Sequence, residues 1–389
     1  MDIHPIEAEP TSDERAAVDH LLGAAESGWT GGVRRPEDDR TAPAGGHAAR
    51  SRRHELLPAL WAVQEHIGWI SPGALNYVCE RLTVPPADAD GVATFYAMLA
   101  VEPRPPRVIH VCEDLACKCV GSDDLIAQLE ERFGPEGDLS DDGSATWYRS
   151  PCLGQCDRAP AALVTVAGEP PEEHVLAPTA ARDVLAALAG EDVPGDPVTT
   201  LPQTDESLRL LSRVGRIDPV SLDEYRAAGG YEILRAAIEL GPEGVIREVK
   251  DSKLMGRGGA AFPTGVKWEA VARQPARPHY LICNADESEP GTFKDRVVIE
   301  GDPFSLIESM TIAGYATGCE RGYVYLRGEY PMAHRILGDA LTEARRRGYL
   351  GDDVLGEGFA FDIEIRKGAG AYICGEETAI FNSIEGFRG

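Results

Sequence analysis

Five of the nine cysteines in this 389-residue sequence fall within one short stretch, from Cys112 to Cys156. Cys112 and Cys117 are separated by four residues, and Cys152 and Cys156 by three. Each pair follows a predicted strand, so the two pairs are expected on loops that face each other. The acidic, polar start of the chain resembles no secretory signal, which favours reduced thiols in the cytoplasm. Clustered reduced thiols more often bind a metal than form a disulfide, and the fold must then bring these two loops together.

Four thiolates on two loops can hold either a tetrahedral zinc ion or a 2Fe-2S cluster. Zinc sites usually have only two residues between cysteines, whereas the wider spacings here suit two irons that each take one pair. A third interpretation is that the thiols are unligated core residues, and the spacing leaves all three open. Gly121 and Gly154 leave room for backbone N–H groups to approach sulfur. Cys119 is interpreted as a bystander thiol.

The charge balance narrows the classes of partner. Lys and Arg total 38 and Asp and Glu total 64, which gives a formal net charge of −26. Such a chain is repelled by nucleic-acid phosphates and by anionic membrane surfaces. No run of about 18 apolar residues is present, so direct membrane insertion is not expected. The length predicts two or three domains.

The segment after the first 50 residues has helical periodicity. Leu56, Leu60, Val63 and Ile67 recur at spacings of three and four, and a Ser-Pro pair at Ser71 starts another helix. We expect a small helical bundle here, after a flexible tail with one short helix near 14–25. The predicted division is a tail at 1–50, the bundle at 51–100, a cysteine-bearing domain at 101–190, a linker at 191–241 and a last domain at 242–389.

The cysteine-bearing segment alternates strands and helices. Arg107–Val111, Ala145–Arg149 and Ala161–Val166 are predicted strands, and Ser122 and Thr179 can each cap a helix. This β-α-β-β-α order, over about 85 residues, matches the size of a thioredoxin-like domain. The last segment again alternates, which predicts an α/β fold with a parallel sheet covered by helices. Its predicted strands are Tyr280–Asn284, Gly322–Leu326 and Phe361–Ile365, and its predicted helices are Phe304–Thr317 and Met332–Arg347.

A glycine-rich segment runs from Met255 to Trp268. Gly256, Gly258 and Gly259 let the backbone approach a phosphate, and a helix beginning near Thr264 adds its positive end. A tight turn without a ligand is the alternative, because the spacing departs from the dinucleotide fingerprint. Two further segments, 283–296 and 368–378, place carboxylates and amides after predicted strands, where open α/β sheets bind ligands. Solvated loops are the alternative for either segment alone.

Several of these motifs carry a family resemblance. The run from Leu57 to Pro72, Gly91-Val-Ala-Thr-Phe-Tyr96, and the two cysteine pairs resemble the thioredoxin-like 2Fe-2S subunit of respiratory complex I, over about residues 50–190. This resemblance implies a 2Fe-2S cluster. Its metal ligands are then Cys112, Cys117, Cys152 and Cys156.

The three later segments together resemble the FMN- and NADH-binding subunit of complex I and the diaphorase subunits of NAD-linked hydrogenases and formate dehydrogenases. The resemblance implies roles residue by residue. Gly256, Arg257, Gly258 and Lys267 hold the FMN phosphate and its surroundings; Asn284, Asp286 and Glu287 bond the flavin; Gly375, Glu376 and Glu377 shape the floor; Phe262 stacks on the NADH adenine; and Glu289 contacts the dinucleotide. No catalytic acid or base is implied, because the flavin accepts the hydride.

The resemblance therefore implies an NADH dehydrogenase (diaphorase) module with FMN, a 2Fe-2S cluster and partner subunits, which is cytoplasmic or peripheral at the cytoplasmic side of a membrane. The alternatives are the NAD⁺-reducing module of a formate dehydrogenase or hydrogenase and, in another class, a zinc-stapled assembly protein. The chain stops at Gly389, inside a familiar stretch, and is expected to be truncated, without the 4Fe-4S ligands of its relatives. Cys79, Cys283, Cys319 and Cys374 are interpreted as core thiols.

Overall fold

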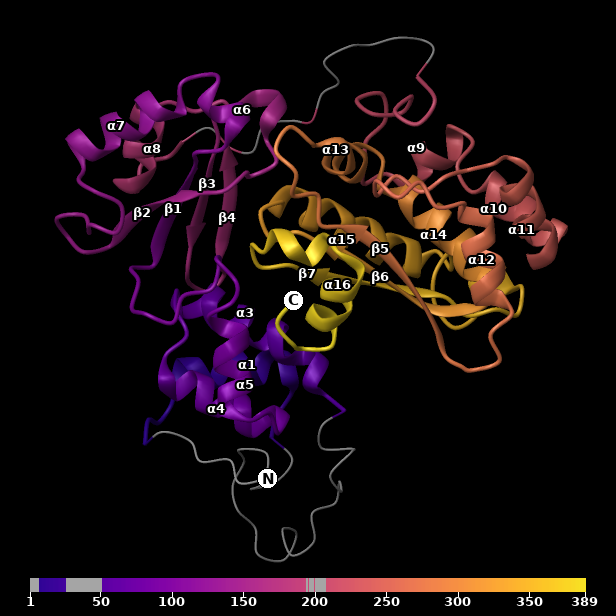
Figure 1. Cartoon of the computed structure of the whole chain (residues 1–389), viewed down its shortest axis with the longest axis horizontal. Helices are drawn as coiled ribbons and strands as arrows, with labels where there is room; N and C mark the ends of the chain where they lie inside the picture. Colours follow the sequence, from indigo (N-terminus) through magenta and orange to yellow (C-terminus); the bar gives the residue numbers. More distant parts are fainter. Residues whose placement is uncertain (1–6, 26–50, 194, 196–198, 200–207) are drawn as a thin grey trace, which may run out of the picture.

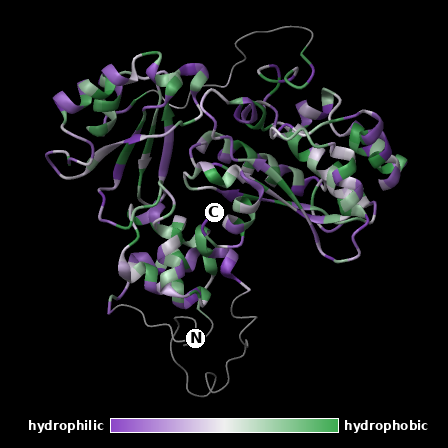
Figure 2. Ribbon diagram, viewed as in Figure 1, coloured by the Kyte–Doolittle hydropathy of each residue, from purple (hydrophilic) through white to green (hydrophobic). Residues whose placement is uncertain are grey.

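The computed structural model describes residues 7–25, 51–193, 195, 199 and 208–389. They form a helical bundle, a four-stranded sheet with helices and a three-stranded sheet with helices (Figure 1). Hydrophobic residues mark the inner strands and helix faces in all three parts (Figure 2). None of the helices in these ranges combines the length and hydropathy that a transmembrane span requires.

The bundle consists of α1 (Ser12–Leu22), α3 (Leu56–Ile67), α4 (Pro72–Leu82) and α5 (Pro86–Ala93). Helix α1 begins and ends slightly earlier than the predicted 14–25 and packs on α3; most of the expected tail at 1–50 lies outside the described residues. The Ser71 hydroxyl accepts a hydrogen bond from the Ala74 N–H (3.0 Å), so the predicted helix start at the Ser-Pro pair is confirmed.

The cysteine-bearing part is a sheet in the order β2-β1-β3-β4, where β1 is Arg107–Cys112, β2 is Ala145–Ser150, β3 is Ala162–Val166 and β4 is Glu172–Leu176. β1 and β2 are parallel, and the other pairs are antiparallel. Helices α7 (Ser122–Arg132) and α8 (Ala181–Leu188) share a hydrophobic core with the sheet.

Three details of this part differ from the sequence prediction. Strand β4 was not predicted, because its Glu172-Glu173-His174 start gives an edge strand little hydrophobic signal. Residue Gly121 and not Ser122 is the N-cap of α7, and Ala180 and not Thr179 that of α8.

The last part is a parallel sheet in the order β5-β6-β7, with β5 at His279–Ala285, β6 at Cys319–Leu326 and β7 at Asp362–Lys367. Long helices α14 (Pro303–Thr317) and α15 (Pro331–Arg346) pack with it, as predicted. Within the expected linker, α9 (Leu222–Ala227) and α10 (Glu232–Leu240) also join this core. Glu308 of α14 accepts hydrogen bonds from the Tyr225 hydroxyl (2.5 Å) and from the Tyr231 and Leu234 N–H groups (2.9 Å each). The domain boundaries themselves remain predictions.

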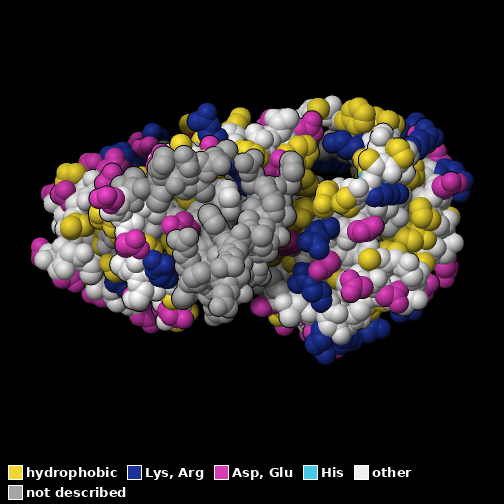
Figure 3. All heavy atoms as spheres, turned by 90° about the horizontal axis from the view of Figure 1, so that it is seen from below, with side chains coloured by type: hydrophobic (Ala, Val, Ile, Leu, Met, Phe, Trp, Pro, Cys, Tyr) yellow, Lys and Arg dark blue, Asp and Glu magenta, His cyan; other side chains and the backbone are white. Residues whose placement is uncertain are grey.

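The bundle shares a continuous core with both sheets. Tyr325 of β6 and Cys374 and Ile380 near the C-terminal end belong to the same hydrophobic cluster as the bundle helices. The Tyr96 hydroxyl bonds Ser383 at 2.6 Å across this boundary. The charged surface is mixed: Figure 3 shows Asp and Glu side chains interspersed with Lys and Arg over the visible face.

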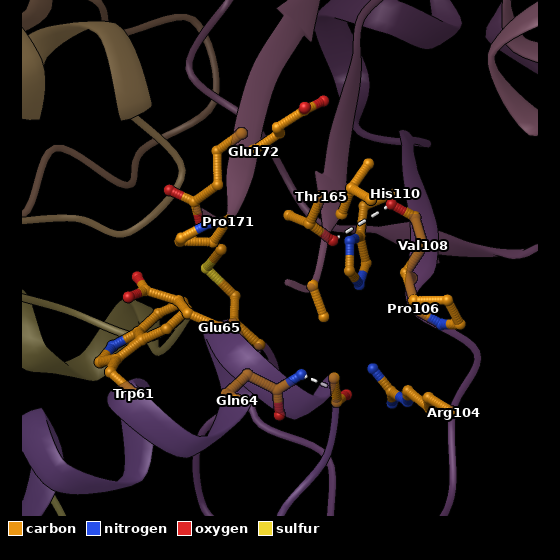
Figure 4. A pocket seen from close by; sticks show the side chains of 15 residues that line it. Trp61, Gln64, Glu65, Arg104, Pro106, Val108, His110, Thr165, Pro171 and Glu172 are labelled. Atoms are coloured by element: carbon orange, nitrogen blue, oxygen red, sulfur yellow. Dashed lines mark hydrogen bonds between the residues drawn. The ribbon is translucent and has the colours of Figure 1, made fainter. Parts of the chain in front are cut away.

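The bundle and the four-stranded sheet meet around a small hollow of about 30 Å³. Figure 4 shows Trp61, Gln64 and Glu65 of α3 on one side and Val108, His110 and Thr165 of β1 and β3 on the other. The side-chain amide of Gln64 donates a hydrogen bond to the main-chain carbonyl of Gly68 (2.6 Å). The side-chain oxygen of the same residue accepts one from the Ala100 N–H (2.9 Å). This hollow is a packed junction and holds little more than a water molecule.

Candidate functional site

The two cysteine pairs meet at one edge of the four-stranded sheet. Cys112 is the last residue of β1, and Cys152 follows the end of the parallel strand β2 by two residues. Carboxyl ends of parallel strands lie at the same edge, so this topology brings the two loops together. Cys112, Cys117 and Cys152 are buried and Cys156 is half-buried, whereas Cys119 is exposed.

The thiols form a chain of contacts. Cys112 is within hydrogen-bond reach of both Cys117 and Cys152, and the Cys152 and Cys156 sulfurs are 3.4 Å apart. Among the described residues, no three or more His, Cys, Asp or Glu side chains are grouped to hold one metal ion. A chain with a thiol pair at each end suits two irons better than one tetrahedral zinc. The donor set therefore fits a 2Fe-2S cluster.

The environment of these sulfurs is polarised. Hydrogen bonds from Cys112 and Cys156 lower the pKa of Cys152. The pKa of Cys112 is raised by its hydrogen bond to Cys117 and then by the one to Cys152, and the pKa of Cys156 is raised by its bond to Cys152. The Gly154 N–H points at the Cys152 sulfur (3.4 Å), as the expected role of Gly154 requires. A second backbone donor, the Gly291 N–H, lies 3.2 Å from the Cys156 sulfur and was not predicted.

A second site is a hollow of about 730 Å³ where three segments of the last part converge. Its size is that of a cofactor or small-molecule pocket. Eight of the twelve residues predicted for flavin and NADH line it: Arg257, Gly258, Asn284, Asp286, Glu287, Glu289, Gly375 and Glu376. Gly259, which was expected to let the backbone approach a phosphate, also lines the hollow. Six further lining residues had no predicted cofactor role, and all stand within or beside the recognised motifs: Ser288, Thr292, Lys294, Asp295, Tyr372 and Ile373.

Asn284 and Asp286 tie two of these segments together. The Asn284 amide donates to the Gly375 carbonyl (2.7 Å) and accepts the Asp286 N–H (3.2 Å). One carboxylate oxygen of Asp286 is buried and has no hydrogen-bond partner among the described residues. Burial, together with the nearby Glu329 carboxylate, raises the pKa of Asp286 to about 7. An unsatisfied buried carboxyl at the wall of a hollow fits a polar, hydrogen-bonding ligand.

Glu287 holds the wall of the hollow from behind. Its buried carboxylate accepts the N–H groups of Asp295 (2.8 Å) and Arg296 (3.2 Å) at the start of α13 (Lys294–Gly301). It also accepts the Tyr330 hydroxyl (3.1 Å). These hydrogen bonds engage the Glu287 carboxylate within the protein. The side chain therefore fixes the loop that forms the wall of the hollow.

Four predicted residues lie outside the lining of the hollow. The Gly256 N–H bonds the Phe262 carbonyl (2.8 Å) in a tight hairpin, and the Phe262 ring is 52% exposed. Lys267 and Glu377 are exposed and 4.0 Å apart. The expected helix does begin at Thr264, as α12 (Thr264–Ala272).

Glu376 has a local structural role as well. Its carboxylate caps α16 (Glu377–Ile384) by accepting the N–H groups of Thr378 (3.0 Å) and Ala379 (3.1 Å). The bond to the Thr378 hydroxyl is the first of several that hold the pKa of Glu376 below its ordinary value. The negative charge of Glu376 therefore also stabilises the N-terminal end of α16.

Comparison with known proteins agrees with this geometry. Residues 46–187 match the family described as thioredoxin-like 2Fe-2S ferredoxin, and residues 249–388 match the Nuo51 FMN-binding domain. A subunit of the NADH-quinone oxidoreductase of Aquifex aeolicus is 53% identical over 180 residues, which are 46% of this chain and 42% of that protein. The alpha subunit of the NAD-reducing hydrogenase HoxS of Cupriavidus necator is 36% identical over 356 residues, which are 87% of this chain and 57% of that protein.

A solved structure has a similar fold over most of this chain. The NAD⁺-reducing NiFe-hydrogenase in the air-oxidized state superposes with a TM-score of 0.66 at 27% identity, over 87% of this chain and 56% of that chain. The chain thus spans about two fifths to three fifths of the length of these relatives. The resemblance drawn from the motifs is confirmed at the level of two domains: one region of the chain matches the thioredoxin-like 2Fe-2S ferredoxin family and a later one matches the Nuo51 FMN-binding domain.

Proposed function

We propose that this chain is an NADH dehydrogenase (diaphorase) module, which oxidises NADH at FMN and passes single electrons to iron–sulfur clusters and partner subunits. One observation carries the proposal. The segment that lines the hollow continues into Gly291, whose N–H lies 3.2 Å from the sulfur of Cys156. The candidate flavin site and the candidate cluster site therefore adjoin each other, as electron transfer between them requires.

The residues around the hollow divide by chemistry. We assign the FMN phosphate and its surroundings to the segment with Gly256, Arg257, Gly258 and Lys267, because glycine N–H groups and cations favour phosphate. Flavin bound there converts the two-electron chemistry of a hydride into the single-electron chemistry of iron–sulfur clusters.

Asn284 and Asp286 face the part of the hollow that we assign to the flavin ring. Their amide and carboxyl groups bind and orient a polar ring edge, and the unpaired Asp286 oxygen is available for this bond. Glu287 fixes the loop that carries both. No acid or base among these residues needs to move a proton for hydride transfer, so their role is orientation.

The nicotinamide nucleotide is assigned to the outer part of the hollow. Gly375 and Glu376 form its floor, next to Glu377, and Glu289 contacts the dinucleotide. Phe262, which like Glu377 lies outside the lining of the hollow, is proposed to stack on the adenine. The exposed ring of Phe262 and the exposed Tyr372 and Ile373 offer apolar surface for that purpose.

Partners and location follow from the same proposal. Relatives of the matched regions are named as subunits, which supports assembly of this chain into a multi-subunit oxidoreductase. We propose a cytoplasmic location, with any membrane contact made through partners.

The reverse direction, reduction of NAD⁺ with electrons from a hydrogenase or formate dehydrogenase partner, is the second candidate. It is favoured by the similarity to the alpha subunit of the NAD-reducing hydrogenase, which extends over 87% of this chain. The same residues serve both directions, because NADH oxidation and NAD⁺ reduction need the same binding and orientation of the flavin and the nucleotide.

An anaerobic absorption spectrum of the purified chain, with iron, sulfide, zinc and flavin analysis before and after NADH, tests the proposal. Flavin with about two irons per chain, and bleaching of the flavin by NADH, is the expected result. Zinc without iron or flavin would contradict the proposed function and support the alternative of a zinc-stapled assembly protein. The rate of NADH oxidation by ferricyanide, compared with the rate of NAD⁺ reduction by a reduced viologen, measures the two directions separately.

A further inference from the structure

Charged side chains of the last part of the chain, the flavin-binding half, lie at its boundary with the cysteine-bearing half. Arg327, the residue directly after β6, is buried, and its guanidinium donates to the main-chain carbonyl of Cys152 in the cluster loop. The same guanidinium donates to the main-chain carbonyl of Glu287 in the flavin loop. Glu329 pairs with it at 2.8 Å. One side chain thus bonds both cofactor loops.

A second arginine repeats this arrangement further along the cluster loop. The buried Arg296 donates from Nε to the Gly154 carbonyl (3.1 Å) and from Nη2 to Asp157 (2.6 Å). Its backbone N–H bonds Glu287, so it also touches the flavin loop. The Tyr330 ring lies so close to Gly154 that a side chain there would overlap it. The cluster loop 152–157 is therefore shaped against the other half.

The contact between the halves reaches a cluster sulfur directly. The Gly291 N–H, in the flavin-binding half, is 3.2 Å from the sulfur of Cys156, 135 positions away in sequence. Hydrogen bonds to cluster sulfurs stabilise the extra negative charge of the reduced cluster and so raise its reduction potential. A positive guanidinium held at the Cys152 carbonyl acts in the same direction.

We propose that the flavin-binding half completes the 2Fe-2S site: Gly291 supplies a hydrogen bond to the sulfur of Cys156, and Arg327 is a positioning residue that holds the Cys152 loop. This rests on the proposed function, because it takes the four thiols as cluster ligands. The consequence is that the cluster potential depends on the docking of the two halves.

The test is a redox titration of the cluster in the full chain, followed by EPR spectroscopy of the reduced 2Fe-2S signal. The variants are Arg327→Gln, which removes charge and bridge, and Arg327→Lys, which keeps the charge. The matched control is Arg81→Gln, since Arg81 is also buried and paired with a carboxylate, Asp19, but lies in the bundle.

At an ambient potential equal to the wild-type midpoint, Arg327→Gln is expected to lower the ratio of reduced to oxidised cluster at least tenfold. That change corresponds to a shift of about 59 mV for one electron. Arg327→Lys is expected to give a smaller shift, and Arg81→Gln less than a twofold change. A loaded cluster with the wild-type midpoint in Arg327→Gln overturns the role of Arg327.

The hydrogen bond from Gly291 is tested without loss of a buried charge. In chain labelled with ¹⁵N-glycine, pulsed EPR of the reduced cluster is expected to show a glycine-nitrogen coupling that Gly291→Ala removes, because the new residue is unlabelled. Identical couplings in the two proteins overturn the assignment, even where Arg327→Gln does not fold. Absence of iron and sulfide from the wild-type chain contradicts the proposed function itself, whereas an unshifted potential in a loaded cluster contradicts only this inference.

Discussion

The ammonium group of Lys367 lies 2.7 Å from the carboxylate of Glu65, so the last strand of the flavin-binding sheet is joined to helix α3 of the bundle. Glu173 of β4 pairs with the same ammonium at 2.9 Å. The ring centre of Trp61 lies 4.0 Å from it. Burial alone would lower the pKa of Lys367, but the two carboxylates hold it above its ordinary value. All three parts of the chain thus meet at one side chain.

Replacement of this lysine should weaken the whole assembly. Lys367→Met leaves the Glu65 and Glu173 carboxylates partly buried without a cation, and we expect a loss of about 1–3 kcal/mol in the free energy of unfolding. Urea denaturation followed by circular dichroism measures it. The control is Lys250→Met, whose ion pair with Glu269 is more exposed and should matter less than about 1 kcal/mol. Equal losses in the two variants would contradict the junction role.

The cluster assignment predicts that neighbouring cysteines differ in their effect. Cys156→Ala should abolish binding of iron and sulfide, because one iron loses a ligand. Cys119→Ala should retain about two irons per chain, since the Cys119 thiol is exposed and lies two residues beyond the proposed ligand Cys117. Iron and sulfide analysis after anaerobic reconstitution compares the two variants. Retention of iron in Cys156→Ala, or its loss in Cys119→Ala, would refute the assignment.

Gly154 should resist replacement for a reason that involves the other half. Its φ of +66° costs an alanine about 1–2 kcal/mol, and the added carbon would also overlap the Tyr330 ring. We expect Gly154→Ala to lose a further 1–3 kcal/mol, roughly, from overpacking. Gly143→Ala is the matched control, because Gly143 has a φ of +71° and open space around it. Thermal unfolding distinguishes them, and similar melting temperatures would exclude the contact with Tyr330.

Asp286 should make the stability of the flavin-free chain depend on pH. Burial raises its pKa from 3.8 to about 7, so the folded chain binds this proton more tightly than the unfolded chain. The resulting stabilisation is complete below the unfolded-state pKa and is lost as pH rises through about 7. The free energy of unfolding of wild type, relative to Asp286→Asn, should therefore fall between about pH 4 and about pH 7. Denaturation at a series of pH values measures this difference, and a difference that is constant with pH would show that Asp286 titrates normally.

Local patterns in the sequence were sufficient to predict most of the elements and the chemistry they carry. Hydrophobic runs located β1, β2, β3 and the three parallel strands, because strand and helix periodicities are local properties. The cysteine spacing alone left three interpretations open, and the resemblance of the cysteine, glycine-rich and acidic motifs to known families indicated both of the domains that the comparisons match. Eight of the twelve residues predicted to bind flavin or NADH line one hollow, and their roles at the cofactors stay predictions.

The connection between the two sites arises instead from the packing of distant segments. Nothing local distinguishes Arg296, Arg327 or Lys367 from a surface cation, yet each is bonded across a boundary to a residue 142 or more positions away. The inward turn of the Glu287 carboxylate depends in the same way on Tyr330, 43 positions later. Such roles arise when two parts of the chain dock, because docking removes water from a polar group and a residue distant in sequence becomes its hydrogen-bond partner. Because that partner is set by the packing of whole domains, a local sequence pattern does not contain it.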